Sequence, residues 1–459
     1  MSTCKKRRNG PSGQPEPRQS PAEHQVSHYC DSITAFSMAS RRENTSPFAV
    51  YTLDWETGRK VRPGPGTDID VCPFFHENER MSRGILPIPP RSVLLVRLSA
   101  RGDIVFASPL VRAFRRTYPH TRLAWMAESH TKDLIELHPE LDEVIVVDRN
   151  RWRRLWGERR LATLFREIKE LVRDLRGRDF DVAIDLQGLL RSGIMTFLSG
   201  APIRIGLGSK EGSKLLMTQV LSRIEGDRRR ISSEYRYLAQ ELALEVGDFK
   251  MEVPLAEADR NWAKEKEEEL ALQDGFFVAL PFTTTPQKHW REDRWAQLMD
   301  RVTEELGFRT VVLGGPEDRA ALDRIRSMTR IEPVSLVGET TLTQASAMVG
   351  RASLVIGVDT GLSHMGIAFD QPTVAIFGSN IPYTKTPTDR AKVIVNWLEC
   401  SPCKGNPTCN GAFTCTELIS VDQVLETAKE VLANQEREKA HAKSPTDPGP
   451  GPMKGELES

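Results

Sequence analysis

The chain has 459 residues, which is long enough for two or three domains with sizeable cores. Its 63 basic and 63 acidic side chains balance, so no net charge favours nucleic acid or an acidic surface as a partner. Hydrophobic residues make up 39% and charged residues 27%, as in globular proteins, and no apolar run approaches the ~20 residues of a membrane helix.

Residues 1–88 are rich in Pro, Gly, Ser and charge and show no sustained apolar periodicity, which predicts a disordered or weakly folded extension. Met81 directly precedes the first convincing strand, so a translation start at Met81 is the alternative to a genuine extension. At the other end, residues 435–459 have low complexity and are predicted to form a disordered tail.

Between these ends, short apolar segments alternate with amphipathic ones. We expect the first strand at 92–98 and a long charged helix at 161–176, and the pattern restarts with a strand at 276–282. Such alternation predicts an α/β fold of parallel sheets with helices on both faces. The restart predicts two domains, at 89–250 and 251–434.

Polar clusters stand where the predicted strands end. They are "SARGD" at 99–103, "DLQGLLRSG" at 185–193, "TTTPQKHW" at 283–290 and "VDTGLSH" at 358–364. In open parallel sheets, ligands bind at the carboxyl ends of the strands. Two facing domains would therefore place these clusters on opposite walls of one cleft.

Two of the clusters suit a phosphate. Asp359 ends a strand, and the helix expected after it offers free backbone N–H groups that a ligand can approach closely at Gly361. Lys288, in the other cluster, can offset the charge of a departing phosphate. The alternatives are that Asp359 only caps the helix, that His364 is a core histidine and that Lys288 is a solvated lysine.

In combination, these segments resemble the ADP-heptose:lipopolysaccharide heptosyltransferases of glycosyltransferase family 9. The resemblance covers 92–432 and rests on the following segments: "VRLSARGDIVFASPLVRAFRRTYP", "DLQGLLRSG", "TTTPQKHW", "VVLGGPED" and "VDTGLSHMGIA" followed by "PTVAIFG". It implies the GT-B architecture, in which two Rossmann-like domains face each other across a cleft. The N-terminal domain would bind the acceptor and the C-terminal domain the nucleotide sugar.

The resemblance implies an inverting glycosyltransferase that moves a heptose from ADP-heptose to a lipopolysaccharide core acceptor. It makes Asp103 the general base that takes a proton from the acceptor hydroxyl, with a plain turn acid as the alternative. On the acceptor side it points to Arg191, whose guanidinium suits phosphates or carboxylates. On the donor side it points to Thr283, Thr284 and Lys288 for the diphosphate and sugar, and to Thr340 for the adenine. It assigns Asp359 to the heptose hydroxyls. It places Thr360, Gly361 and His364 at the start of the helix that binds the phosphates.

One segment departs from the family pattern. Residues 202–219 read "PIRIGLGSKEGSKLLMTQ" and contain Arg204, Lys210 and Lys214. These cations suit an anionic acceptor, and a solvated loop is the equal alternative. The acceptor is therefore less well defined by the sequence than the donor.

Four of the seven cysteines cluster within sixteen residues, as Cys400, Cys403, Cys409 and Cys415. Four thiolates at this spacing could hold a structural Zn²⁺ or an iron–sulfur cluster, and free thiols or local disulfides are the alternative. Catalysis is expected to need no cofactor, because Lys288 and the helix start can neutralise the leaving diphosphate. The odd cysteine count and the absence of an apolar leader favour a reducing, cytoplasmic location.

The expected partners are ADP-heptose and a lipid-linked lipopolysaccharide precursor at the inner face of the membrane, without nucleic acid. Two other functions stay open: an epimerase of GT-B architecture acting on a sugar nucleotide, and a non-catalytic sugar-nucleotide binder. An NAD-dependent oxidoreductase is disfavoured, because no Gly-x-Gly-x-x-Gly follows an early strand.

Overall fold

The structure is a computed structural model that describes residues 52–54, 59–61, 86, 89–223, 229–380, 383–403 and 406–443. Most of the predicted extension and much of the predicted tail therefore lie outside the described residues. Within the extension, strands β1 (Thr52–Asp54) and β2 (Arg59–Val61) pair antiparallel, with Thr52 opposite Val61.

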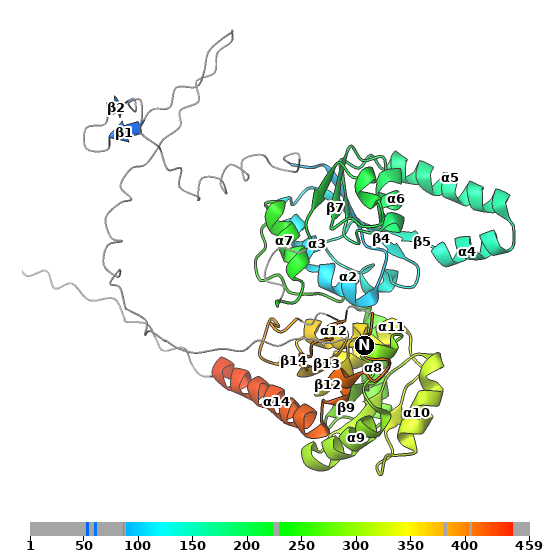
Figure 1. Ribbon diagram of the computed structural model, residues 1–459, viewed down its shortest axis with the longest axis vertical. Coiled ribbons are helices and arrows are strands. Elements are labelled where there is room, and N and C mark those ends of the chain that lie inside the picture. The colour runs from blue at the N-terminus through cyan, green and yellow to red at the C-terminus, as the bar shows by residue number, and fades with distance from the viewer. Residues whose placement is uncertain are drawn as a thin grey trace, which may run out of the picture. The chain divides into compact units, whose positions relative to one another are not determined.

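The N-terminal domain is built on a six-stranded parallel sheet with the order β5-β4-β3-β6-β7-β8 (Figure 1). Its first strand, β3, is buried along its whole length, as expected for a strand covered on both faces. The strands are β3 (Ser92–Val96), β4 (Arg122–Glu128), β5 (Glu143–Val147), β6 (Val182–Asp185), β7 (Ile203–Leu207) and β8 (Gln219–Leu221). The helices are α2 (Arg101–Ala107), α3 (Pro109–Thr117), α4 (Arg149–Gly157), α5 (Leu161–Gly177), α6 (Leu190–Leu198) and α7 (Ser233–Glu241).

The C-terminal domain repeats this topology, with the strand order β11-β10-β9-β12-β13-β14, again all parallel. The strands are β9 (Phe276–Leu280), β10 (Arg309–Val312), β11 (Val334–Ser335), β12 (Leu354–Val358), β13 (Thr373–Phe377) and β14 (Ala391–Val395). The helices are α8 (Glu257–Glu269), α9 (Glu292–Leu306), α10 (Arg319–Arg326), α11 (Leu342–Val349), α12 (Gly361–Ala368), α13 (Thr414–Glu417) and α14 (Val421–Lys443).

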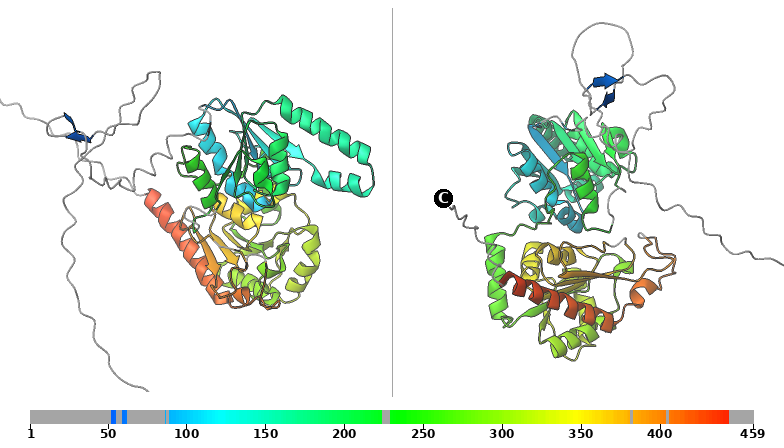
Figure 2. Two further views of the ribbon diagram at one scale, coloured as in Figure 1. Left: turned by 45° about the horizontal axis from the view of Figure 1, so that its top comes forward. Right: turned by 90° about the vertical axis from the view of Figure 1, so that its left-hand side faces the viewer.

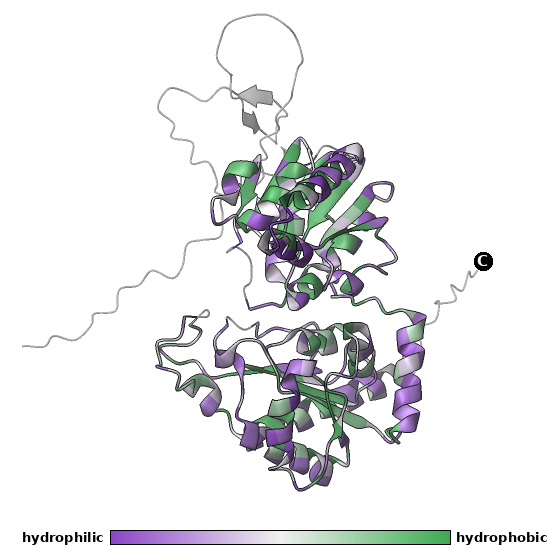
Figure 3. Cartoon of the chain, turned by 90° about the vertical axis from the view of Figure 1, so that its right-hand side faces the viewer, coloured by the Kyte–Doolittle hydropathy of each residue, from purple (hydrophilic) through white to green (hydrophobic). Residues whose placement is uncertain are grey.

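In both sheets the chain starts at an inner strand, moves outward to one edge and then returns to the other side of the first strand. The direction reverses between β3 and β6 in one sheet and between β9 and β12 in the other. This is the Rossmann order, and the reversal opens a crevice at the carboxyl ends of the two strands. The predicted α/β fold with two Rossmann-like sheets is confirmed, and helices cover both faces of each sheet (Figures 2 and 3).

The predicted domain boundaries stay predictions, but the C-terminal end needs one correction. Helix α14 continues to Lys443, past the predicted domain end at 434 and into the predicted tail. Its buried side chains, including Val424, Leu425 and Val431, join the core of the C-terminal domain. Beyond residue 434, Glu438 pairs with Arg390 of the same domain, which holds this end of the helix against it. Of the helices that the structure describes, none is long and apolar enough to cross a membrane.

Candidate functional site

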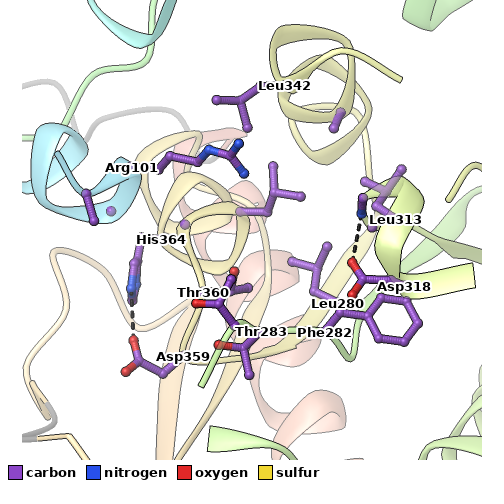
Figure 4. Close-up of a pocket in the computed structure, with 18 of the residues that line it drawn as sticks. Arg101, Leu280, Phe282, Thr283, Leu313, Asp318, Leu342, Asp359, Thr360 and His364 are labelled. Carbon is purple, nitrogen blue, oxygen red and sulfur yellow. Dashed lines mark hydrogen bonds and ion pairs between the residues drawn. The ribbon is translucent and has the colours of Figure 1, made fainter. Parts of the chain in front are cut away.

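A cavity of about 810 Å³ lies between the two domains, at the carboxyl ends of β3, β9, β10 and β12. The N-terminal wall comes from the turn at 99–103 and from α2. The C-terminal wall comes from the segments that follow β9, β10 and β12, so the cavity lies at the crevice of the second sheet. Figure 4 shows Thr283, Asp359 and Thr360 on the C-terminal side and Arg101 reaching in from α2.

Every residue predicted from the sequence for the donor or for proton transfer lines this cavity. They are Asp103, Thr283, Thr284, Lys288, Thr340, Asp359, Thr360, Gly361 and His364. The residue predicted for the acceptor, Arg191, lines a second cavity of about 410 Å³ instead. Ser99, Ala100 and Asp103 border both cavities, so the two meet at Asp103.

Asp359 is the centre of a buried polar network on the C-terminal wall. Its side chain is 8% exposed, and Oδ2 accepts hydrogen bonds from Lys288 Nζ at 2.8 Å and Asn380 Nδ2 at 2.7 Å. Its Oδ1 lies 3.2 Å from His364 Nε2. Burial opposes ionisation, but the hydrogen bond and charge of His364 and the charge of Lys288 outweigh it and hold the pKa of Asp359 well below its usual range. Asp359 therefore stays ionised inside the protein.

The network continues from His364 to Tyr383, whose hydroxyl lies 2.9 Å from His364 Nδ1. Burial raises the pKa of Tyr383 well above its usual value, so the hydroxyl keeps its proton. Nε2 of His364 is directed at Asp359 and Nδ1 at Tyr383, so the imidazole ring links the two side chains. Phe106 of α2 packs on His364 with 4.5 Å between ring centroids, which brings an aromatic side chain of the N-terminal domain against the network.

Sequence reasoning missed Asn380 and Tyr383. Both lie after β13, in the segment "FGSNIPY". Asp359 was predicted because ligands bind at the carboxyl ends of parallel strands, and the same argument applies to the end of β13. What the sequence lacked was any sign that these side chains turn back toward β12. Their contacts with Asp359 and His364 show that they belong to the same site.

Two glycines let the domains approach closely beside the cavity. A Cβ atom on Gly102 would stand 2.7 Å from Cδ2 of His364, and one on Gly361 would stand 3.1 Å from Cβ of Arg101. The first turns of α2 and α12 thus face each other with no room for larger residues. The space beside Gly361, which the sequence suggested for a ligand, is partly taken by Arg101.

On the N-terminal wall, Asp103 lies in the first turn of α2, and its side chain is 38% exposed. Its Oδ2 accepts from the backbone N–H of Ala100 at 3.2 Å and pairs with the guanidinium of Arg97. Arg97 is itself buried and donates to Leu186 O at 2.9 Å. A buried arginine therefore orients Asp103 from behind and leaves it open to the cavity.

The second cavity is predominantly cationic. It is lined by Arg97, Arg191, Lys210 and Arg223 against the acids Asp103 and Glu234. Both Glu234 oxygens accept from Arg223 at 2.8 Å. The side chains of Arg191 and Lys210 make no ion pair with any residue that the structure describes, so their charges face the cavity without compensation, as an anionic ligand requires.

The three cations of residues 202–219 that were considered as acceptor contacts occupy different surroundings. Lys210 lines the second cavity, whereas Arg204 and Lys214 do not. The guanidinium of Arg204 donates to Leu216 O at 2.8 Å and Ala201 O at 2.7 Å. Arg204 therefore braces its own loop.

The four clustered cysteines are free thiols in this structure, and Cys415 is buried, which raises the pKa of its thiol. In the described part of the chain, no three or more His, Cys, Asp or Glu side chains gather closely enough to hold a metal ion. The structure thus gives no support to the zinc or iron–sulfur interpretation, and the metal stays a prediction.

Comparison with known proteins agrees with this geometry. Residues 168–413 match glycosyltransferase family 9 (heptosyltransferase). Lipopolysaccharide heptosyltransferase 1 of Pseudomonas aeruginosa is 27% identical over 315 residues, which cover 68% of this chain and 85% of that protein. Lipopolysaccharide heptosyltransferase 2 of Salmonella typhimurium is 25% identical over 362 residues, which cover 75% of this chain and 99% of that protein.

Solved structures share the fold. A family 9 glycosyl transferase from Veillonella parvula superposes with a TM-score of 0.63 at 23% identity, covering 75% of this chain and 97% of that one. The ADP-heptose lipopolysaccharide heptosyltransferase II of E. coli gives a TM-score of 0.56 at 21% identity, covering 75% of this chain and 99% of that one. The family match spans more than half of the sequence. This chain therefore belongs to glycosyltransferase family 9, the heptosyltransferase family.

Proposed function

We propose that this enzyme transfers a heptose from ADP-heptose to a lipopolysaccharide core acceptor with inversion at the anomeric carbon. The observation that carries the proposal is the meeting of the two cavities at Asp103: one holds all the predicted donor residues, and the other is cationic. Related proteins from Pseudomonas aeruginosa and Salmonella typhimurium bear the name lipopolysaccharide heptosyltransferase, which supports the same reaction.

On the donor side, the diphosphate would lie against Lys288 and the first turn of α12, at Thr360 and Gly361. Lys288 offsets the negative charge that grows on the diphosphate as its bond to the anomeric carbon breaks. Thr283 and Thr284 would donate hydroxyl hydrogen bonds to the phosphates and the sugar. Asp359 would accept hydrogen bonds from the heptose hydroxyls, and Thr340, which lines the cavity beside α11, would contact the adenine.

On the acceptor side, Asp103 would take the proton of the attacking hydroxyl while the new C–O bond forms on the face opposite to the diphosphate. The transition state resembles an oxocarbenium ion. The ion pair with Arg97 fixes the carboxylate for this step. Arg191 and Lys210 would bind phosphates or carboxylates of the acceptor core.

The experiment is an ADP-release assay with purified protein, ADP-heptose and heptose-deficient lipopolysaccharide. We expect release only when both substrates are present. Release no faster than in buffer, with ADP binding intact, would exclude transfer and favour a sugar-nucleotide binder. Conversion of the donor alone into another sugar nucleotide would favour an epimerase.

Two further parts of the proposal concern location and metal. We propose that the enzyme acts in the cytoplasm at the inner membrane face, which fractionation of cells tests. A structural zinc at the four cysteines, from Cys400 to Cys415, remains a separate proposal. Metal analysis of protein purified without chelator tests it, and protein free of both zinc and iron would exclude it.

A further inference from the structure

Helices α4 and α5 form a helical arm, residues 149–177, that projects from the N-terminal domain (Figures 1 and 2). The arm follows β5, the edge strand on that side of the sheet. Leu155 and Leu164 are buried and belong to the two helices, which pack against each other. No residue of the arm lines either cavity described above, so the arm has no part in the proposed chemistry.

The arm is strongly basic although the whole chain is neutral. It holds ten arginine and lysine residues against four acidic ones, a net charge of +6. Arg149 and Arg151 are engaged, with Glu128 and Glu167 respectively. The guanidinium groups of Arg154 and Arg159 make no ion pair or hydrogen bond with the described part of the chain, and both side chains are exposed.

The tip of the arm also exposes large apolar side chains. Trp156 and Phe165 are each 65% exposed, and Leu161 is 40% exposed. Trp156 lies in the last turn of α4, while Leu161 and Phe165 lie one turn apart on one face of α5. Two exposed aromatic rings and a leucine at the end of a projecting hairpin are a surface that favours contact with an apolar phase.

We propose that the tip of this arm docks on a lipid bilayer that contains anionic headgroups. Arginine pairs well with the headgroup phosphates, and tryptophan and phenylalanine settle at the boundary between headgroups and acyl chains. The charge of the arm complements such a surface, and the three apolar side chains would have no apolar partner on a nucleic acid backbone. The inference rests on the proposed function, since a lipid-linked acceptor is met at a bilayer surface.

A second exposed apolar row lies on the neighbouring helix. Helix α6 packs against α5 and exposes Leu190, Ile194 and Phe197, which recur at i, i+4 and i+7 and so share one face. Arg191, next to Leu190, lines the cationic second cavity. The helix that supplies the proposed acceptor contact thus also presents apolar side chains to its surroundings, as a helix lying against lipid would.

The test is co-sedimentation of the full chain with vesicles of phosphatidylcholine alone or mixed with phosphatidylglycerol. We expect binding only to the mixed vesicles, and weaker binding at higher salt. Arg154→Ala/Arg159→Ala should weaken partitioning about 30-fold, and Trp156→Ala/Phe165→Ala about tenfold. Arg260→Ala/Lys264→Ala, which removes the same charge from exposed positions of α8, should change partitioning by less than about twofold.

A second measurement separates this inference from the proposed function. Heptose transfer to a water-soluble, delipidated acceptor should be equal in the wild type and both arm variants. Absence of transfer with intact vesicle binding would remove the proposed function and still support the docking arm. Equal binding to both vesicle types, unchanged binding of both arm variants, or retention by an oligonucleotide without vesicle binding would each overturn the inference.

Discussion

The two walls of the main cavity hold their acidic side chains in opposite ways. Asp359, on the C-terminal wall, is buried and held by Lys288, Asn380 and His364. Asp103, on the N-terminal wall, is 38% exposed and has one cationic partner, Arg97, behind it. A carboxylate with all its partners in place suits binding, whereas a carboxylate with an open side can receive a proton from a second substrate. The comparison predicts that the two walls will respond differently to substitution.

The largest effect is expected for Asp103→Asn, which keeps the shape but removes the base. Turnover should fall roughly 10²- to 10⁴-fold, while the Kd for ADP should stay within about twofold. Steady-state kinetics and calorimetric ADP titration measure the two quantities. Asp274→Asn, at an exposed position outside both cavities, is the matched control and should leave both unchanged. An equal loss of ADP binding and turnover in Asp103→Asn would contradict the division between the walls.

Lys288→Ala should act on the other wall and lower kcat/KM by roughly 10²- to 10³-fold, with weaker ADP binding. It also leaves the buried Asp359 without its cation, so the free energy of unfolding should drop by up to about 3 kcal/mol. In a double-mutant cycle with Asp359→Asn, the second substitution should restore part of that stability. Additive losses in the cycle would mean that the pair does not couple.

A smaller effect is expected where the walls touch. Gly102→Ala places a methyl group 2.7 Å from His364 Cδ2, so the first turn of α2 must shift. We expect a loss of about 1–3 kcal/mol in stability together with slower turnover. Gly177→Ala, at the end of α5 with open space beside it, should instead be neutral or stabilise by up to about 1 kcal/mol. Thermal unfolding of both variants distinguishes crowding at the domain contact from a general intolerance of alanine.

The comparison of the walls also shows what the sequence could predict. The inner strands β3, β6, β9, β12 and β13 are apolar and buried along their whole length, so their alternation with helices is visible in the residue pattern. The rule that ligands bind at the carboxyl ends of parallel strands then located the cavity. The role of Arg97 could not be predicted, because the predicted strand 92–98 includes it. In the structure β3 ends at Val96, and the guanidinium of Arg97 pairs with Asp103. Contacts between segments distant in sequence, such as Tyr383 with His364, leave no mark in a local pattern.

The smallest effect concerns pH and follows from the lowered pKa of Asp359. A carboxyl group whose pKa is lower in the folded than in the unfolded state stabilises the fold at every pH above its unfolded pKa of about 3.9. That stabilisation is lost as the pH falls from there through the folded pKa. The stability difference between wild type and Asp359→Asn, from denaturant unfolding, should therefore hardly change between about pH 8 and pH 5 and shrink below about pH 4. A difference that already shrinks between about pH 7 and pH 5 would mean that Asp359 is not kept ionised by its partners.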